Sequence, residues 1–245
     1  MNRTADVVIV GAGVIGSATA FELAKRGYKT LNIDKLPASG YGSTSNSCAI
    51  VRAHYSTWDG VAMAYEGFFY WDDWNKYLEV EDERGMAKYM KTGSIMFMLK
   101  GADHSKKSLN LFKEIGVEHE IWDLETLKKK MPIYSHDSYN GTSRPDEDDS
   151  FFDKSGDQIE GAVWTPGSGY VSDPQLATHN LQVATEAKGG EFLFDAEITE
   201  IRQSNGQIQG VTLKSGEQID CKVLVNVAGP HSFIINQMAG VEDDM

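Results

Sequence analysis

The sequence predicts an α/β fold that begins with a strand, a glycine turn and a helix, and three patterns carry this prediction. Residues 7–10 (Val-Val-Ile-Val) form a continuous apolar run, as expected for a parallel strand buried on both faces. Apolar residues then recur at helical spacing through residues 14–24, and Gly27 stands where a helix-ending glycine belongs. A second short strand, residues 30–33, ends in Asp34. Together these segments predict a Rossmann-like βαβ unit in a doubly wound sheet.

The turn between the first strand and the helix has the glycine spacing of a dinucleotide-binding site. The first glycine allows a tight turn, the second lets the backbone approach phosphates, and the third lets the helix pack closely on the sheet. The helix N-terminus also directs unpaired N–H groups and the positive end of its dipole at an anion. The sequence therefore predicts a pyrophosphate site, called the glycine cradle here, formed by Gly11, Ala12, Gly13, Val14, Ile15 and Gly16.

Asp34 adds a second cofactor contact, because it lies about twenty residues beyond the glycines. At that place an acidic side chain accepts hydrogen bonds from a ribose 2′-hydroxyl. Its charge would repel a 2′-phosphate, so a ligand of the NADP type is disfavoured. The alternative is a doubly wound domain with a tight turn and an incidental surface aspartate.

Composition narrows the class of protein further. A chain of 245 residues can form one large domain or two modest ones. The net charge of −13 argues against nucleic acid or an anionic membrane surface as the main partner. No apolar run has the length of a membrane span, and the first strand follows the N-terminus too closely for a signal peptide. Two cysteines are too few for a disulfide framework or a metal cluster, which predicts a reducing cytoplasm and no metal site.

Periodicity and turn residues predict the elements that follow the βαβ unit. After a small-residue, hydroxyl-rich loop at 37–47, an amphipathic helix with an aromatic stripe is expected at 61–78, and that stripe is typical of core rather than of a ligand cage. The patterns further predict strands at 92–99 and 162–164, helices at 105–115, 123–130 and 174–187, and a solvated polar loop at 135–154.

A β-meander is expected near the end of the sequence. Its strands are predicted at 198–202, 208–213 and 219–227, and Asn-Gly and Ser-Gly turns separate them. The last of these strands runs into Ala228-Gly229-Pro230.

Three separated segments now point to a family: the glycine cradle with Asp34, residues 42–52 (GSTSNSCAIVR) and residues 226–232 (NVAGPHS). With these segments the chain resembles the flavin-dependent amine and amino-acid oxidoreductases of the D-amino acid oxidase superfamily, particularly the sarcosine oxidase, glycine oxidase and dimethylglycine dehydrogenase branch. The resemblance implies an FAD-binding domain with a β-meander at 1–88 and 159–245, and part of an α+β substrate domain at 89–158.

The resemblance also implies how FAD would be held. Its adenosine diphosphate half would lie on the glycine cradle beside Asp34 and Lys35, and the small-residue loop would follow the pyrophosphate toward the flavin. The further residues implied are Ser43, Thr44, Ser45, the backbone at Ala49 and Ile50, the backbone of Ile198 at adenine, and Ala228 with Gly229 closing over the cofactor. For residues 228–230 a plain strand-ending turn is the alternative.

Two departures from the relatives limit what can be carried over. Some relatives tether the flavin covalently through a histidine in the loop after the ribose strand, and Asn46 stands at that place here. The FAD is therefore expected to be non-covalent at this loop. His231 stands where many relatives have an aromatic residue, and a lone histidine is more often structural than catalytic, so no catalytic residue is assigned.

Arg52 is the candidate for substrate recognition. In the sarcosine oxidase branch an arginine at the matching place holds the substrate carboxylate, and Tyr55 matches an aromatic residue near the same pocket. A guanidinium suits this task because its fork of donors binds a carboxylate in a bidentate manner. The alternative is that Arg52 pairs only with a structural acidic side chain.

The implied reaction is the oxidation of a C–N bond in a small amino acid or N-methylated amine. Hydride would pass to flavin N5, and water would hydrolyse the resulting imine. The relatives continue well beyond the place of Met245, so a C-terminal fragment or partner chain is expected to complete the enzyme, and the strand at 92–99 is expected to lack sheet neighbours. The alternatives are an NAD-dependent dehydrogenase and a non-catalytic FAD-binding subunit.

Overall fold

The computed structural model describes residues 3–100, 104–139, 144 and 146–241, and the chain divides into two compact units. The first unit comprises Met1–Ala49, Asp73–Tyr89 and Val171–Met245, and the second comprises Ile50–Asp72 and Met90–Tyr170. The predicted domain boundaries differ from this division, because residues 50–72 and 159–170 lie in the second unit. The functions assigned to the domains stay a prediction.

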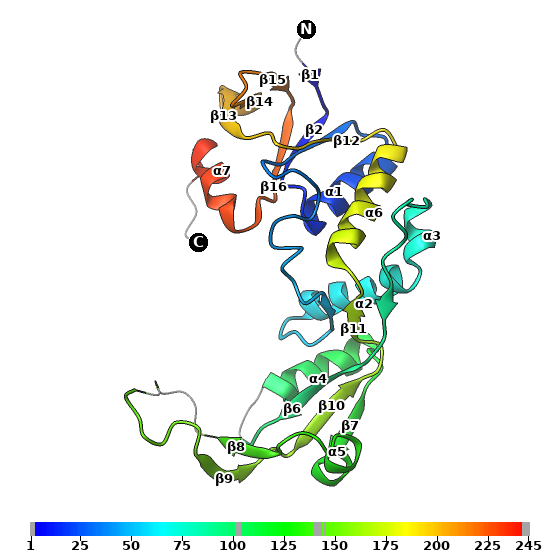
Figure 1. Cartoon of the computed structure of the whole chain (residues 1–245), viewed down its shortest axis with the longest axis vertical. Coiled ribbons are helices and arrows are strands. Elements are labelled where there is room, and N and C mark those ends of the chain that lie inside the picture. The colour runs from blue at the N-terminus through cyan, green and yellow to red at the C-terminus, as the bar shows by residue number, and fades with distance from the viewer. Residues whose placement is uncertain (1–2, 101–103, 140–143, 145, 242–245) are drawn as a thin grey trace. The chain divides into compact units, whose positions relative to one another are not determined.

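The first unit contains the predicted parallel sheet (Figure 1). Its strand order is β12-β3-β2-β16, with β12 at Glu191–Leu193, β3 at Thr30–Ile33, β2 at Val7–Val10 and β16 at Val223–Asn226. All neighbouring pairs are parallel. Helix α1 (Val14–Lys25) follows β2 and packs against α6 (Pro174–Ala187). The α/β fold class with a Rossmann-like unit is thereby confirmed.

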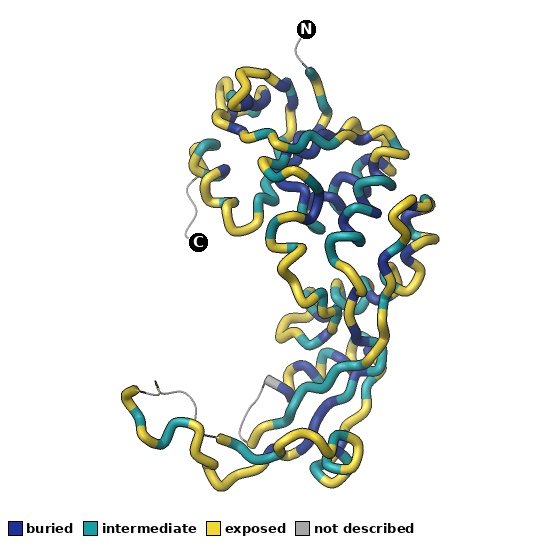
Figure 2. The backbone as a smooth tube through the Cα atoms, in the orientation of Figure 1, coloured by how far each residue is buried: buried dark blue, intermediate teal, exposed yellow. Residues whose placement is uncertain are grey.

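The two faces of the parallel sheet pack against different layers. Val7 and Ile9 lie in a core cluster with Ala20 of α1, whereas Val8 and Val10 lie in a cluster with residues of the meander. This alternation follows from the two-residue period of a strand. Figure 2 shows that the buried residues of this unit follow the sheet and the helices beside it. Both faces of the sheet are therefore covered, which explains the unbroken apolar run.

The meander forms a second sheet of order β1-β15-β14-β13, with β1 at Arg3–Thr4, β15 at Gln218–Asp220, β14 at Gln207–Leu213 and β13 at Ile198–Ser204. The prediction of one strand at 219–227 is wrong, because β15 and β16 belong to different sheets. The N–H of Cys221 donates to the carbonyl of Gln209 in the meander, and two residues later Val223 pairs with Val7. An apolar run that changes sheets looks continuous in sequence.

The helix predicted at 61–78 is also interrupted. The structure has α2 at Trp58–Asp72 and α3 at Trp74–Leu78, and the two helices lie in different units. The backbone of Asp73 between them has φ −108° and ψ 38°, which lies outside the helical region. Aromatic periodicity continues across this residue, so the pattern did not show the break.

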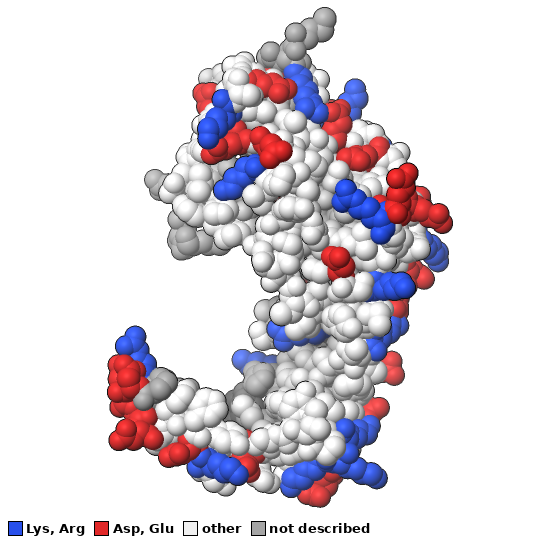
Figure 3. Space-filling view, viewed as in Figure 1, with Lys and Arg blue, Asp and Glu red and all other residues white. Residues whose placement is uncertain are grey.

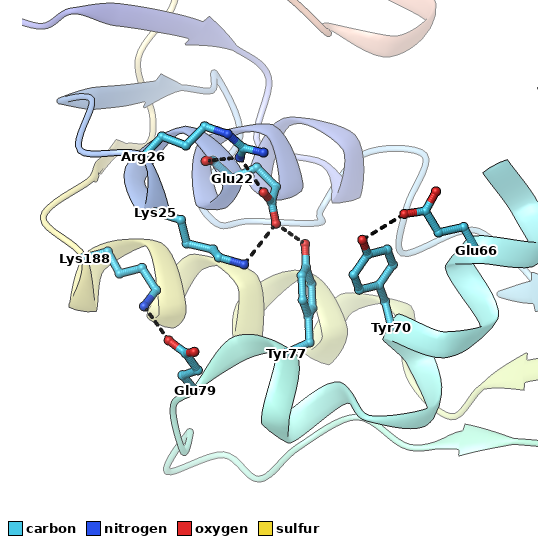
Figure 4. A network of polar contacts seen from close by, with 8 residues as sticks. All are labelled: Glu22, Lys25, Arg26, Glu66, Tyr70, Tyr77, Glu79 and Lys188. Atoms are coloured by element: carbon cyan, nitrogen blue, oxygen red, sulfur yellow. Dashed lines mark hydrogen bonds and ion pairs between the residues drawn. The ribbon is translucent and has the colours of Figure 1, made fainter.

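Polar contacts hold α3 against α1 and α6 within the first unit (Figure 4). Tyr77 Oη donates to Glu22 Oε1 at 2.9 Å, and Lys188 Nζ pairs with Glu79 Oε2 at 2.9 Å. Burial raises the pKa of Glu22, but hydrogen bonds from Arg26, Tyr77 and Lys25 outweigh it and hold that pKa below its usual value. Figure 4 also shows Tyr70 donating to Glu66 along α2 of the second unit.

The second unit is built on an antiparallel sheet of order β6-β10-β7, with β6 at Ser94–Met98, β10 at Gly161–Thr165 and β7 at Glu120–Asp123. Helices α4 (His104–Ile115) and α5 (Leu124–Lys130) confirm the predicted helices there. The expectation that residues 92–99 lack sheet neighbours is wrong, since β6 pairs with β10 along its whole length. Phe112 of α4 and Val163 of β10 are fully buried in the core of this unit.

Shorter elements complete the chain. The segment expected to be a polar loop forms a hairpin of β8 (Asp137–Tyr139) and β9 (Lys154–Gln158), whose exposed residues carry no strand-like alternation. The remaining elements are β4 (Ile50–Val51), which pairs with β11 (Gly169–Val171), β5 (Tyr89–Met90), the 3-10 turn η1 (Gly229–His231) and α7 (Ser232–Met238).

Two surface properties bear on function. Among the described residues, no helix combines the length and the apolar character that crossing a membrane needs. Figure 3 shows acidic and basic side chains in several separate groups on the face drawn, with uncharged residues between them, so the charge is not concentrated in a single patch there.

Candidate functional site

The glycine cradle requires glycine for steric reasons at its first and last positions. Gly11 has φ 111°, and a Cβ there would lie 2.5 Å from the carbonyl oxygen of Val227. A Cβ on Gly16 would lie 2.0 Å from the carbonyl oxygen of Gly11. Both obstacles are backbone atoms that a side-chain rotation cannot remove. The glycine spacing therefore reflects close backbone packing between β2, α1 and the end of β16.

Asp34 contacts the cradle directly. Its Oδ2 accepts a hydrogen bond from the N–H of Ala12 at 2.8 Å, and its Oδ1 accepts one from the N–H of Leu36 at 2.9 Å. The half-buried carboxylate thus ties the end of β3 to the glycine turn. The structure brings the predicted ribose-binding residue and the predicted pyrophosphate site together, and both lie beyond the carboxyl ends of parallel strands.

The N-terminus of α1 meets the small-residue loop. The N–H of Val14 donates to Thr44 Oγ1 at 3.1 Å, and a Cβ on Gly13 would lie 3.2 Å from the same oxygen. The N–H of Gly40 donates to the carbonyl of Ala12 at 2.8 Å, which holds the loop beside the cradle. The residues of the first turn of α1 are all described, and none of them is acidic. This arrangement fits an anion at the helix N-terminus.

The other loop residues of the predicted cofactor site are mostly exposed. Ser43 and Ser45 are exposed, and Ser45 Oγ donates to the carbonyl of Gly42. The side chain of Ile15, in the first turn of α1, is 67% exposed, which is unusual for a large apolar residue. Ala49 has φ 52°, a left-handed conformation that is strained for a residue with a Cβ. Ile50 belongs to the second unit.

Ala228 and Gly229 follow β16 and come next to Gly11. A Cβ on Gly11 would lie 3.3 Å from Cα of Ala228. Asn226, to which the sequence assigned no role of its own, supports this turn: its Oδ1 accepts from the N–H of Ala228 at 3.3 Å. Its Nδ2 donates to the carbonyl of Ser232 at 2.8 Å and to Asn236 Oδ1 at 2.7 Å. The polar residue at the end of an apolar strand was the available signal.

Ile198 and Lys35 flank a pocket of the first unit. Ile198 is buried in the core at the start of β13, and a backbone contact of this residue with adenine stays a prediction. Lys35 is exposed and lines a pocket of about 520 Å³. The pocket is also lined by Leu36, Leu193, Phe194, Asp195, Ala196, Glu197, Leu213, Lys214, Ser215 and Glu217. It therefore opens beyond the ends of β3 and β12 and next to the segment that leads into Ile198.

Arg52 and Tyr55 are brought together in the second unit. Cζ of Arg52 lies 5.7 Å from the centre of the Tyr55 ring. Both residues are exposed, and within the described part of the chain no carboxylate lies within ion-pair distance of the Arg52 guanidinium. The described residues thus offer no structural acid for Arg52, and its substrate-binding role stays a prediction. Residues 52–55 are called the carboxylate segment below.

Contacts from outside hold the carboxylate segment, and no pattern in the sequence indicated them. They come from Phe112, Thr165 and Ser108. The ring of His54 stacks on Phe112 with centroids 5.5 Å apart, and its Nε2 lies 2.8 Å from Thr165 Oγ1. Ser108 Oγ donates to the carbonyl of Tyr55 at 3.0 Å. Burial and the positive charge of Arg52 lower the pKa of His54 to about 4. Since its contacts come from distant sequence positions, no local signal could have identified them.

Comparison with known proteins identifies the family. A sequence model described as FAD dependent oxidoreductase matches residues 6–244. The chain belongs to this family. Its members depend on FAD, and the NAD-dependent alternative does not agree with that membership. The resemblance drawn from the sequence is therefore confirmed.

Individual relatives within the family differ in their named substrates. The chain is 29% identical to "Monomeric sarcosine oxidase" of Bacillus sp. over 97% of its own length and 55% of that protein. It is 25% identical to "Glycerol 3-phosphate dehydrogenase" of Caloramator mitchellensis over 95% of its length and 43% of that protein. It shares the fold of the L-proline dehydrogenase from P. horikoshii, with a TM-score of 0.79 and 22% identity over 100% of this chain and 58% of that one. The chain thus spans about half the length of these relatives.

Proposed function

We propose that this chain contributes FAD binding and substrate-carboxylate binding to an enzyme that oxidises the C–N bond of a small amino acid or N-methylated amine. The observation that supports it best is the carboxylate segment, where Arg52 lies on Tyr55 with no carboxylate partner among the described residues. A guanidinium in that state suits a ligand that brings its own carboxylate.

The residues of the first unit fit FAD. The backbone at Gly13 carries no Cβ, and Thr44 Oγ1 lies 3.2 Å from where one would stand and accepts from the N–H of Val14, which marks an acceptor position at the helix N-terminus. In this proposal Asp34 holds the ribose, while Lys35 and the backbone near Ile198 receive the adenosine end beside the pocket of about 520 Å³. Ser43, Ser45, Ala49, Ala228 and Gly229 of the first unit would line the rest of the cofactor.

The chemistry divides between cofactor and protein. A bound FAD would supply the two-electron acceptor for oxidation of the carbon next to the substrate nitrogen, and water would hydrolyse the resulting imine. Arg52 holds the substrate carboxylate and thereby orients the carbon that is oxidised. The Tyr55 hydroxyl provides a further hydrogen bond at the same place. The full enzyme also needs residues equivalent to those of its longer relatives, from a C-terminal segment or a partner chain.

Binding of FAD is tested by a visible absorption spectrum, since bound flavin absorbs in the blue and a nicotinamide does not. Anaerobic addition of glycine, sarcosine and glycerol 3-phosphate then separates the substrate classes. We expect the first two to bleach the spectrum. Bleaching by glycerol 3-phosphate alone would contradict oxidation of a C–N bond, and no bleaching by any of them would favour a non-catalytic FAD-binding subunit.

The role of Arg52 is tested by Arg52→Ala in the full-length enzyme. Loss of a bidentate contact should raise KM for an amino-acid substrate by roughly thirtyfold, while KM for the matching amine without a carboxylate stays nearly constant. Arg84→Ala is the matched control, because it removes an exposed arginine of the first unit. Equal changes of KM for both substrates would contradict the proposal.

A further inference from the structure

We propose that His54 is a positioning residue for Arg52: its ring, held by Phe112 and Thr165, fixes the backbone that presents Arg52 and Tyr55 to a substrate carboxylate. This inference rests on the proposed function, because it assumes that Arg52 binds that carboxylate.

The ring of His54 is held from two different elements. Phe112 of α4 stacks on it with an interplanar angle of 30°, and Thr165 at the end of β10 lies 2.8 Å from its Nε2. Phe112 is fully buried and Thr165 is 1% exposed, so both partners are themselves fixed by the core of the second unit. A side chain held by two immobile neighbours fixes the position of its own Cα.

The backbone on each side of His54 is also held. Ala53 is fully buried, and the carbonyl of Tyr55 accepts from Ser108 Oγ at 3.0 Å. Ala53 is buried and His54 is half-buried, whereas Arg52 and Tyr55 are exposed. The two middle residues therefore form a fixed base, and the two end residues expose their side chains. With a fixed base, little backbone entropy is lost when Arg52 binds a ligand, and only its side chain has to be ordered.

The charge state of His54 supports this role. The ring contacts Phe112 from α4 and Thr165 from β10, and among the described residues Arg52 is the charged group that acts on it. Burial and that charge keep the pKa of His54 near 4, and the ring is therefore neutral at physiological pH. A neutral ring stays seated against Phe112 and leaves Arg52 as the cation that meets the carboxylate.

The experiment uses the full-length, FAD-loaded enzyme and the variants His54→Leu, Thr165→Val and His54→Gln. Glutamine places an amide near the position of Nε2 and keeps the hydrogen bond to Thr165. We expect His54→Leu and Thr165→Val to raise KM for the amino acid, and the acetate dissociation constant read from the flavin spectrum, by about tenfold. The kcat for the amine without a carboxylate should stay constant, and His54→Gln should restore KM to within about threefold of wild type.

His119→Leu is the matched control, since the His119 ring also contacts Phe112, at 5.7 Å, but lies outside the carboxylate segment. Equal losses for both substrates in His54→Leu, or the same carboxylate-specific loss in His119→Leu, would show a purely structural role and overturn the inference. If Arg52→Ala itself shows no preference for the carboxylate, the proposed function fails and the inference with it.

A second readout does not depend on turnover. Nitrogen-15 spectra of the imidazole rings in the full chain should show a neutral His54 ring at pH 6, and Thr165→Val should shift its Nε2 resonance. A His54 ring that is protonated at pH 6 would contradict its placement against Phe112 and Thr165, whatever the result for Arg52.

Discussion

Backbone atoms form the glycine cradle of the first unit, whereas side chains from distant positions hold the carboxylate segment of the second. In the cradle, Gly11, Gly16 and Val227 approach through main-chain atoms, and Asp34 accepts main-chain N–H groups. In the carboxylate segment, His54 depends on Thr165 and Phe112. A site made of backbone depends on the absence of side chains, and a site made of side chains depends on the packing beneath it.

The largest expected effect is a loss of stability in Gly16→Ala that Gly13→Ala does not share. Gly16→Ala places a Cβ 2.0 Å from the Gly11 carbonyl oxygen, and we expect it to lower the free energy of unfolding by about 3 kcal/mol, measured by urea unfolding without FAD. Gly13→Ala is the control, because its Cβ would lie 3.2 Å from Thr44 Oγ1, a side-chain atom that can shift by a few tenths of an ångström, and not against backbone. That variant should lose FAD affinity with a stability loss below about 1 kcal/mol. Equal stability losses would contradict this distinction.

Lowering the pH should reduce the free energy of unfolding of the second unit, because His54 is half-buried in its neutral form. Its folded-state pKa of about 4 lies below the ordinary value of 6.5, so the unfolded state binds more protons between these values. The stability that a neutral His54 provides is complete above pH 6.5 and is lost as the pH falls toward 4, by at most about 3 kcal/mol. Urea unfolding at pH 7 and pH 4.5 measures it, and His54→Gln should flatten the slope. An unchanged slope in that variant would refute the assignment to His54.

Asp34 should matter for stability even without FAD. Asp34→Ala leaves the N–H groups of Ala12 and Leu36 without their carboxylate acceptor, and we expect a loss of about 2 kcal/mol in the free energy of unfolding. Asp34→Asn keeps one side-chain oxygen and should lose less, while both variants should bind FAD more weakly. If Asp34→Ala unfolds like wild type in the absence of FAD, the carboxylate acts only on the ribose.

The smallest expected effect is a gain. Ala49 has φ 52°, and glycine adopts this conformation without the steric cost that a Cβ imposes. Ala49→Gly should therefore stabilise the chain by ~1 kcal/mol in thermal or urea unfolding. Ala38→Gly serves as a control, because Ala38 is not among the residues with positive φ. A loss of stability in Ala49→Gly would mean that the Ala49 side chain makes packing contacts that outweigh the strain.

The same contrast explains what the sequence could predict. Gly11 could be predicted because its requirement is partly local: the backbone turns there with φ 111°. Asp34 could be predicted from its spacing after the glycines, whereas Thr44 was implied only by the family resemblance. The meander and α6 were also accessible, since turn glycines and the Asp173 cap mark their ends. Local patterns carry this information directly.

Other features depended on contacts between remote segments. His54 and Thr165 are separated by 111 positions, and neither residue type reveals the other. The break at Asp73 and the passage from β15 to β16 were missed because an apolar pattern continues across both. Burial by a different partner, rather than a change in residue type, decides where such a run divides.

The passage from β15 to β16 has a consequence for the order of events during synthesis on the ribosome. Residues 7–10 emerge early, yet β16 pairs with β2 through Val223 and Val7, and the turn at Gly11 closes against Val227. The cradle is therefore a contact of very high sequence separation, which slows its formation. Until residues near 227 leave the exit tunnel, the nascent chain exposes one edge of β2, and that edge needs protection from pairing with other chains.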